Sequence, residues 1–130
     1  MTKSINWAFT AQVSDGPTQQ LSGSIDIEGY EEIEVDVTAG ASTKVNVQPA
    51  DGGLFLLISS SNYDTLTYEV LDATDKAVGT PSTKTLDGPH ILVGAGAVAL
   101  LETAENTIKF SKGGSEDATV NILVGRDATP

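Results

Sequence analysis

The chain has no cysteine among its 130 residues. This excludes a disulfide framework, a thiolate nucleophile and a cysteine-ligated zinc site. Long apolar runs are also missing, because the longest are LFLLI at 54–58 and AVALL at 97–101, far short of the ~20 residues that span a bilayer. Residues 1–9 lack the apolar core of a signal peptide. We therefore expect a soluble protein.

Positive charge is scarce. Seven lysine and arginine residues stand against 18 aspartates and glutamates, which gives a formal net charge of -11. Such a chain is repelled by the phosphates that dominate nucleic-acid affinity and by anionic membranes. We expect neither as a partner. The acidic surface suits a basic protein surface or divalent cations, although simple solvation explains it equally well.

Aromatic residues and catalytic motifs are few. The chain has three Phe, three Tyr and one Trp, whereas sugar-cleaving clefts usually have several aromatic side chains. His90 is the only histidine, so any Ser-His-Asp arrangement would depend on it alone, and no G-x-S-x-G elbow accompanies it. We expect no enzyme, and we assign no catalytic residue, cofactor or metal ligand. Trp7 is expected in the core.

What the sequence does contain is alternation of apolar and polar residues, the period of strands with one buried face. The turn-forming cluster SDGPTQQ at 14–20 ends the first such strand, and Gly29 is expected to turn the chain after the second. The predicted inward-facing residues of the first four strands are Ile5, Trp7, Phe9, Ala11 and Val13; Leu21, Ile25 and Ile27; Ile33, Val35 and Val37; and Val45 and Val47.

Later segments continue the pattern. Pro49 is expected to close the fourth strand. LFLLIS at 54–59 is apolar on both faces and predicts a central strand, whereas 72–87 reads as a long loop with a short edge strand around 83–86. Eight or nine short strands joined by Gly, Pro, Asp and Ser turns predict an all-β fold, an antiparallel β-sandwich of jelly-roll-like type. We expect one domain over residues 1–130.

The stretch PHILVGAGAVALL at 89–101 matches the dinucleotide-binding spacing G-x-G-x-x-A at Gly94, Gly96 and Ala99. Such a site needs a helix N-terminus and parallel neighbouring strands, and a nucleotide-dependent oxidoreductase would follow from it. The flanking alternation is antiparallel in character. We therefore interpret the glycines as a hinge between two core-filling β segments, with a sharp bend, a bulge or a close strand approach there.

Residues 26–36 hold six of the carboxylates. If 21–28 and 31–37 paired as a hairpin, like charges would lie opposite each other and would need solvent or a partner to compensate them. A hydrated outer face is the plain interpretation, and a calcium site is another, although no EF-hand pattern supports it. Arg126, the only arginine, can reach a carboxylate on a neighbour or pair within the chain near Asp127. The candidate partner-binding residues are Glu28, Glu31, Glu32, Glu34, Asp36 and Arg126.

The β runs from Ile5 to Val124 and the acidic face at 26–36 together resemble the cement or decoration proteins that tailed bacteriophages add to their capsids. The resemblance is one of kind and transfers no family residue to a position here. It implies a structural protein on the virion surface that binds and stabilises capsid subunits, and a homo-oligomer, often a trimer. The alternative is a carbohydrate- or calcium-dependent adhesion module.

Overall fold

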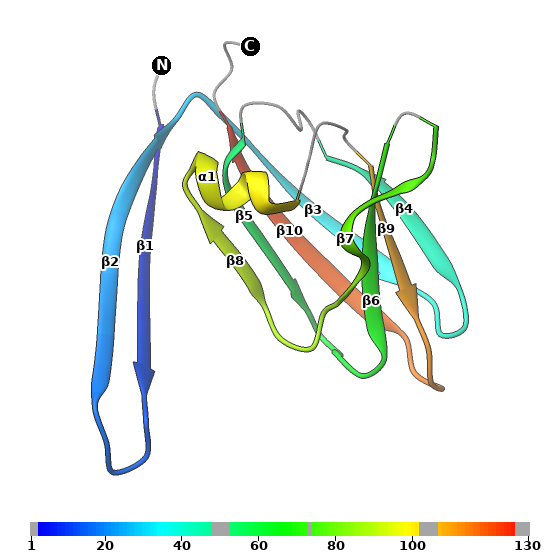
Figure 1. Cartoon of the computed structure of the whole chain (residues 1–130), viewed down its shortest axis with the longest axis horizontal. Helices are drawn as coiled ribbons and strands as arrows, with labels where there is room; N and C mark the ends of the chain where they lie inside the picture. Colours follow the sequence, from blue (N-terminus) through cyan, green and yellow to red (C-terminus); the bar gives the residue numbers. More distant parts are fainter. Residues whose placement is uncertain (1–2, 48–52, 73, 102–106, 127–130) are drawn as a thin grey trace.

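A computed structural model of the chain (Figure 1) describes residues 3–47, 53–72, 74–101 and 107–126. Within these ranges the chain forms ten strands, so the all-β prediction is confirmed with one strand more than the highest number expected. The strands are β1 (Lys3–Gln12), β2 (Thr18–Ile27), β3 (Gly29–Val37), β4 (Ser42–Asn46), β5 (Gly53–Ser60), β6 (Leu66–Leu71), β7 (Ala77–Thr85), β8 (His90–Val93), β9 (Thr107–Lys112) and β10 (Ala118–Arg126).

Eight of these strands form two four-stranded antiparallel sheets. Sheet I has the order β3-β10-β5-β8 and sheet II the order β4-β9-β6-β7. The strands pair as β3 with β10, β4 with β9, β5 with β8 and β6 with β7. The chain is thus a long antiparallel ribbon folded so that successive strand pairs alternate between the sheets. This is the topology of a jelly roll.

The core lies between the two sheets. Its largest fully buried side chains include Tyr68 and Phe110 from sheet II and Ile58 and Ile122 from sheet I. In β3 and β10 every second residue turns inward, and Val35 lies opposite Val120 in the ladder. The alternation of apolar and polar residues in β3 and β10 therefore marks one face buried in the sandwich, as predicted.

Two strand predictions have different outcomes. The central strand at 54–59 is confirmed, because β5 lies between β10 and β8. The long loop predicted over 72–87 is wrong over most of its length, because β7 runs from Ala77 to Thr85. The edge strand expected around 83–86 is confirmed, but it begins earlier than predicted. In the β6–β7 ladder Thr83 lies opposite Glu69 but Val78 lies opposite Val70, so the residues between them bulge out. A bulged edge strand accepts the Gly and Pro that made the segment read as a loop.

The glycine-rich stretch is also only partly as predicted. Gly94 has φ +96 and makes a sharp bend after β8. The segment after it is not a β segment: α1 (Ala95–Val98) and a 3-10 turn, η1 (Ala99–Leu101), follow at once. The local preference of alanine for helix explains this. Val98 is buried against the core, while a Cβ at Gly96 would meet nothing within 4 Å, so no close strand approach exists there.

The first two strands stand apart from the sandwich. β1 and β2 pair only with each other and form a two-stranded ribbon, here called the arm, that projects beside sheet I (Figure 1). Only Glu28 separates β2 from β3, so the turn expected at Gly29 makes no hairpin. The pairing considered for 21–28 with 31–37 does not occur, because β2 pairs with β1 and β3 with β10. Most core positions predicted on the arm are wrong too: Phe9, Leu21 and Val13 are 48%, 57% and 62% exposed, and Trp7 lies outside the core. Ile27, at the base of the arm, is buried as predicted.

Pro49 lies outside the described residues. In the described part of the chain no helix has the length and apolar character needed to cross a membrane.

Candidate functional site

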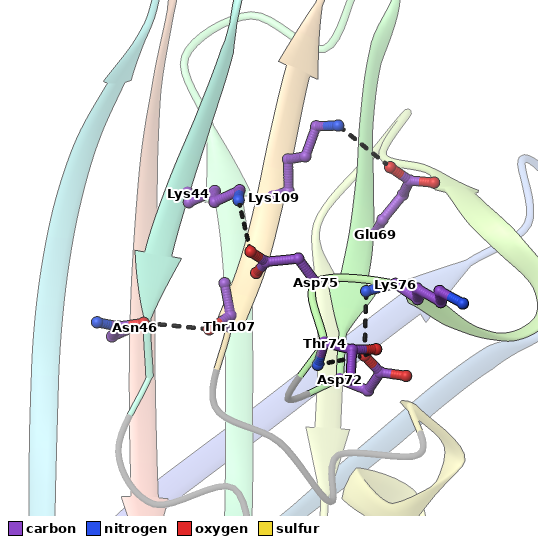
Figure 2. Close-up of polar contacts among 9 residues, drawn as sticks. All are labelled: Lys44, Asn46, Glu69, Asp72, Thr74, Asp75, Lys76, Thr107 and Lys109. Carbon is purple, nitrogen blue, oxygen red and sulfur yellow. Dashed lines mark hydrogen bonds and ion pairs between the residues drawn. The ribbon is translucent and has the colours of Figure 1, made fainter.

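The outer faces of the two sheets differ sharply in chemistry. On sheet II the outward side chains are polar, and they bond to one another across the strands (Figure 2). Lys109 Nζ lies 3.8 Å from Glu69 Oε1, and Lys44 Nζ lies 3.4 Å from Asp75 Oδ2. Thr107 Oγ1 donates to Asn46 Oδ1 at 3.1 Å. This face is built to remain in water.

The turn between β6 and β7 is held by one carboxylate (Figure 2). Asp72 Oδ1 accepts hydrogen bonds from Thr74 Oγ1 at 2.6 Å, Thr74 N at 2.8 Å and Lys76 N at 3.0 Å. These bonds, with the Thr74 hydroxyl foremost, hold the pKa of Asp72 below its ordinary value of 3.8. The carboxylate is thus fully used in shaping the turn.

The outer face of sheet I is apolar across its middle. Ladder positions place Leu123, Leu57 and Ile91 side by side on β10, β5 and β8, and Phe55 beside Val93 in the row above. We call Phe55, Leu57, Ile91, Val93 and Leu123 the apolar stripe. Phe55 is buried, Leu57 and Leu123 are half-buried, and Ile91 is 45% exposed. The exposed part of the stripe, at Ile91 and the half-buried side chains beside it, is a candidate binding surface.

An acidic row borders the stripe. Glu32, Glu34 and Asp36 lie on the outer face of β3, opposite Leu123, Asn121 and Thr119 of β10. All three are exposed, and Asp36 Oδ1 accepts a hydrogen bond from Thr119 Oγ1 at 3.0 Å. Since β3 pairs with β10 and not with β2, the neighbours of the acidic row are neutral. A groove of about 410 Å³ lies between this row and the stripe.

The other predicted partner-binding residues lie elsewhere. Glu31 belongs to the inward face of β3 with Ile33 and Val35, and its Oε1 is buried without a hydrogen-bond partner. Glu28 is exposed, and its amide donates to the carbonyl of Arg126 at 3.0 Å. The Arg126 guanidinium lies against Gly29, 3.7 Å from the position of a Cβ there. Asp127 is outside the described residues. The six candidates thus do not form one surface.

The arm meets sheet I only at its base. Ile5 and Ile27 pack over Gly125 and Phe55, and Lys3 Nζ lies 5.9 Å from the centre of the Tyr30 ring. Farther along, the apolar face of the arm stands off and leaves a groove of about 440 Å³. Trp7, Phe9 and Leu21 line it from the arm, and Pro89, Ile91 and Val93 from the sheet. Both walls of this groove are apolar.

The single histidine has a structural neighbour. Tyr68 Oη and His90 Nδ1 lie 2.9 Å apart, which ties β6 in sheet II to β8 in sheet I. Burial raises the pKa of Tyr68 to about 12. Among the described residues no three or more His, Cys, Asp or Glu gather closely enough to hold a metal ion.

Comparison with known proteins found no matching family model, curated protein or solved structure.

The acidic row is visible in the sequence as alternating carboxylates, whereas the arm and the stripe are not distinguishable there from core strands. The apolar residues of β1 and of LFLLIS are visible in the sequence, but their pattern predicts core strands and not an exposed apolar face. One further signal was the charge pattern, because residues 4–25 contain a single charged side chain, Asp15. A strand pair with an apolar face and almost no charge is a candidate contact surface.

Proposed function

We propose that this protein is a structural component of a protein assembly, of the kind that binds and stabilises a shell from outside, as capsid decoration proteins do. The observation that carries the proposal is the arm, whose apolar residues Phe9 and Leu21 are about half exposed beyond its base. A two-stranded ribbon is at best marginally stable alone in water. A chain that devotes 20 strand residues to one gains from it when another protein covers it.

The body of the molecule supports the same function. A jelly roll is a rigid platform, although the fold by itself does not specify function. Its sheet I combines the apolar stripe with the acidic row along one edge, while sheet II is polar and internally bonded. Two surfaces of different chemistry suit a subunit that contacts its own kind and also a shell. The acidic row is the surface we assign to a basic region of the shell.

The test is co-sedimentation of the protein with shells assembled from the major capsid protein encoded by the same genome. We expect saturable binding and a higher temperature of shell disruption. The variant Glu32→Gln/Glu34→Gln should weaken binding, and the loss should shrink at high salt because the contribution is electrostatic.

A matched control removes two charges elsewhere. Asp64→Asn/Glu116→Gln changes exposed turn residues away from the arm and should leave shell binding unchanged. Absence of wild-type binding at any salt concentration would contradict the proposal. Equal loss in both double variants would show that total charge, and not the acidic row, governs the contact.

A further inference from the structure

We infer that the apolar face of the arm is the contact between copies of this chain: a second copy covers it and fills the groove between the arm and sheet I. The inference deepens the proposed function, on which it rests, by assigning the arm to self-association and leaving the acidic row for the shell.

The arm carries apolar side chains that no other described part of the chain covers fully. In β3, β9 and β10 the alternating apolar residues are covered by the opposite sheet. On the arm the same alternation places five of the ten ladder pairs on one face, and the middle three of these are Ile5 with Ile25, Trp7 with Gly23 and Phe9 with Leu21. Phe9 and Leu21 are each about half exposed. An apolar face that extends to this pair and is exposed there implies a cover.

The groove continues the contact that the base of the arm already makes with sheet I. The base of the arm is already packed on the sheet through Ile5 and Ile27, which are seated over Gly125 and Phe55. The groove beyond the base extends that contact with the same chemistry on both walls: Trp7, Phe9 and Leu21 face Pro89, Ile91 and Val93. An occupant must therefore be apolar and thin. The apolar face of a second arm, on which Phe9 and Leu21 are about half exposed, is apolar, and a two-stranded ribbon is thin.

The near absence of charge on the arm favours a second copy over a basic partner. The protein has a net charge of -11, but residues 4–25 contain only Asp15. A basic protein would find no counter-charges on the arm. A second copy meets no repulsion there, because both contacting arms are nearly neutral while their acidic rows lie on β3.

Size predicts a weak, concentration-dependent contact. The part of the arm beyond its base is roughly 20 Å long and 10 Å wide, so its face covers roughly 200 Å². With a similar area on the facing stripe, two copies bury roughly 800 Å², which is at the weak end for specific interfaces. Neighbouring positions on a shell would strengthen it by raising the effective concentration.

The test is sedimentation equilibrium of the full chain from ~1 µM to ~1 mM, the range in which a contact of this size assembles. We expect the average mass to rise to that of a dimer or trimer. Trp7, the only tryptophan, supplies an independent signal: its fluorescence should shift to shorter wavelength as association buries it.

Two charge-matched variants separate the faces of the arm. Phe9→Lys/Leu21→Lys changes one ladder pair on the apolar face, and Thr10→Lys/Gln20→Lys changes the adjacent pair on the opposite face. The first should weaken association by ~30-fold or more, and the second should leave it nearly unchanged. Circular dichroism should show the same β-sheet content in both, since all four side chains are exposed.

A wild-type protein that stays monomeric to ~1 mM, or equal association in the two variants, would overturn the inference. A monomer that still binds shells would leave the proposed function intact, whereas an oligomer that binds no shell would preserve the inference and remove the function.

Discussion

The Cδ1 atom of Ile5 lies 2.6 Å from the position that a Cβ on Gly125 would occupy. A Cβ at this position would force the Ile5 side chain or the two strands to shift, so the absence of a side chain on Gly125 lets the base of the arm lie close to β10. Ile27 Cγ2, at 3.1 Å from the same point, closes the seat from the other strand. The position of the arm thus depends on one glycine in the last strand.

Gly125→Ala should therefore displace the arm base and destabilise the protein by about 1–3 kcal/mol, the usual cost of overpacking. Urea denaturation followed by circular dichroism measures this. Gly96→Ala is the matched control, because a Cβ there meets nothing within 4 Å and Gly96 lies in α1. It should be neutral or stabilising by up to about 1 kcal/mol. Equal stability in the two variants would mean that the Ile5 contact yields without cost.

The turn held by Asp72 predicts a response to acid. Hydrogen bonds lower the pKa of this carboxyl below 3.8 in the folded chain, so the folded state binds the proton less readily than the unfolded state. Its contribution to stability is present above pH 3.8 and is lost as pH falls through the lowered pKa. Asp72→Ala should lower the melting temperature at pH 7 and reduce the acid dependence. Asp64→Ala, in another exposed turn, should change the acid dependence less.

The sequence predicts correctly the strands whose apolar faces are covered by the rest of the fold. β5 reads as a central strand and is one, and β3 and β10 bury the faces that their alternation marks. Alternation states which face is apolar but not what covers it. For that reason Trp7 and Phe9 were predicted in the core, although they lie on the arm.

Other errors had local causes. β7 was read as a loop because its Gly and Pro suggest turns, and only the bulged ladder with β6 shows that an edge strand accommodates them. The helix at Ala95–Val98 was missed because four residues are too few to show helical periodicity. The acidic row at Glu32, Glu34 and Asp36 was located correctly, whereas the partner strand β10 was not predictable without the topology.

The Tyr68–His90 pair predicts a response to alkali. Burial raises the pKa of Tyr68 to about 12 from 10.0, so the folded chain holds this proton more tightly than the unfolded chain. The associated stability is complete below pH 10 and is lost as pH rises toward 12. Tyr68→Phe should lower stability at pH 7 by about 1 kcal/mol through loss of the hydrogen bond to His90.

The same variant should show less decline in stability between pH 10 and pH 12, measured by urea denaturation at each pH. Tyr30→Phe is a suitable control because Tyr30 is 51% exposed; it should retain the wild-type decline. An identical alkaline decline in Tyr68→Phe would show that other groups cause it.

Glu31 and Glu32 are neighbours in sequence with opposite surroundings, and they give the final prediction. Glu31 shares the inward face of β3 with Ile33, and its Oε1 is buried with no hydrogen-bond partner. A buried acceptor without a partner costs about 1–3 kcal/mol, so Glu31→Leu should raise the free energy of unfolding by about 1 kcal/mol or more. Glu32→Leu, on the exposed face beside Leu123, should change it little and should instead weaken shell binding. Urea denaturation of both variants distinguishes the two roles, and a loss of stability in Glu31→Leu would mean that its carboxylate is needed where it lies.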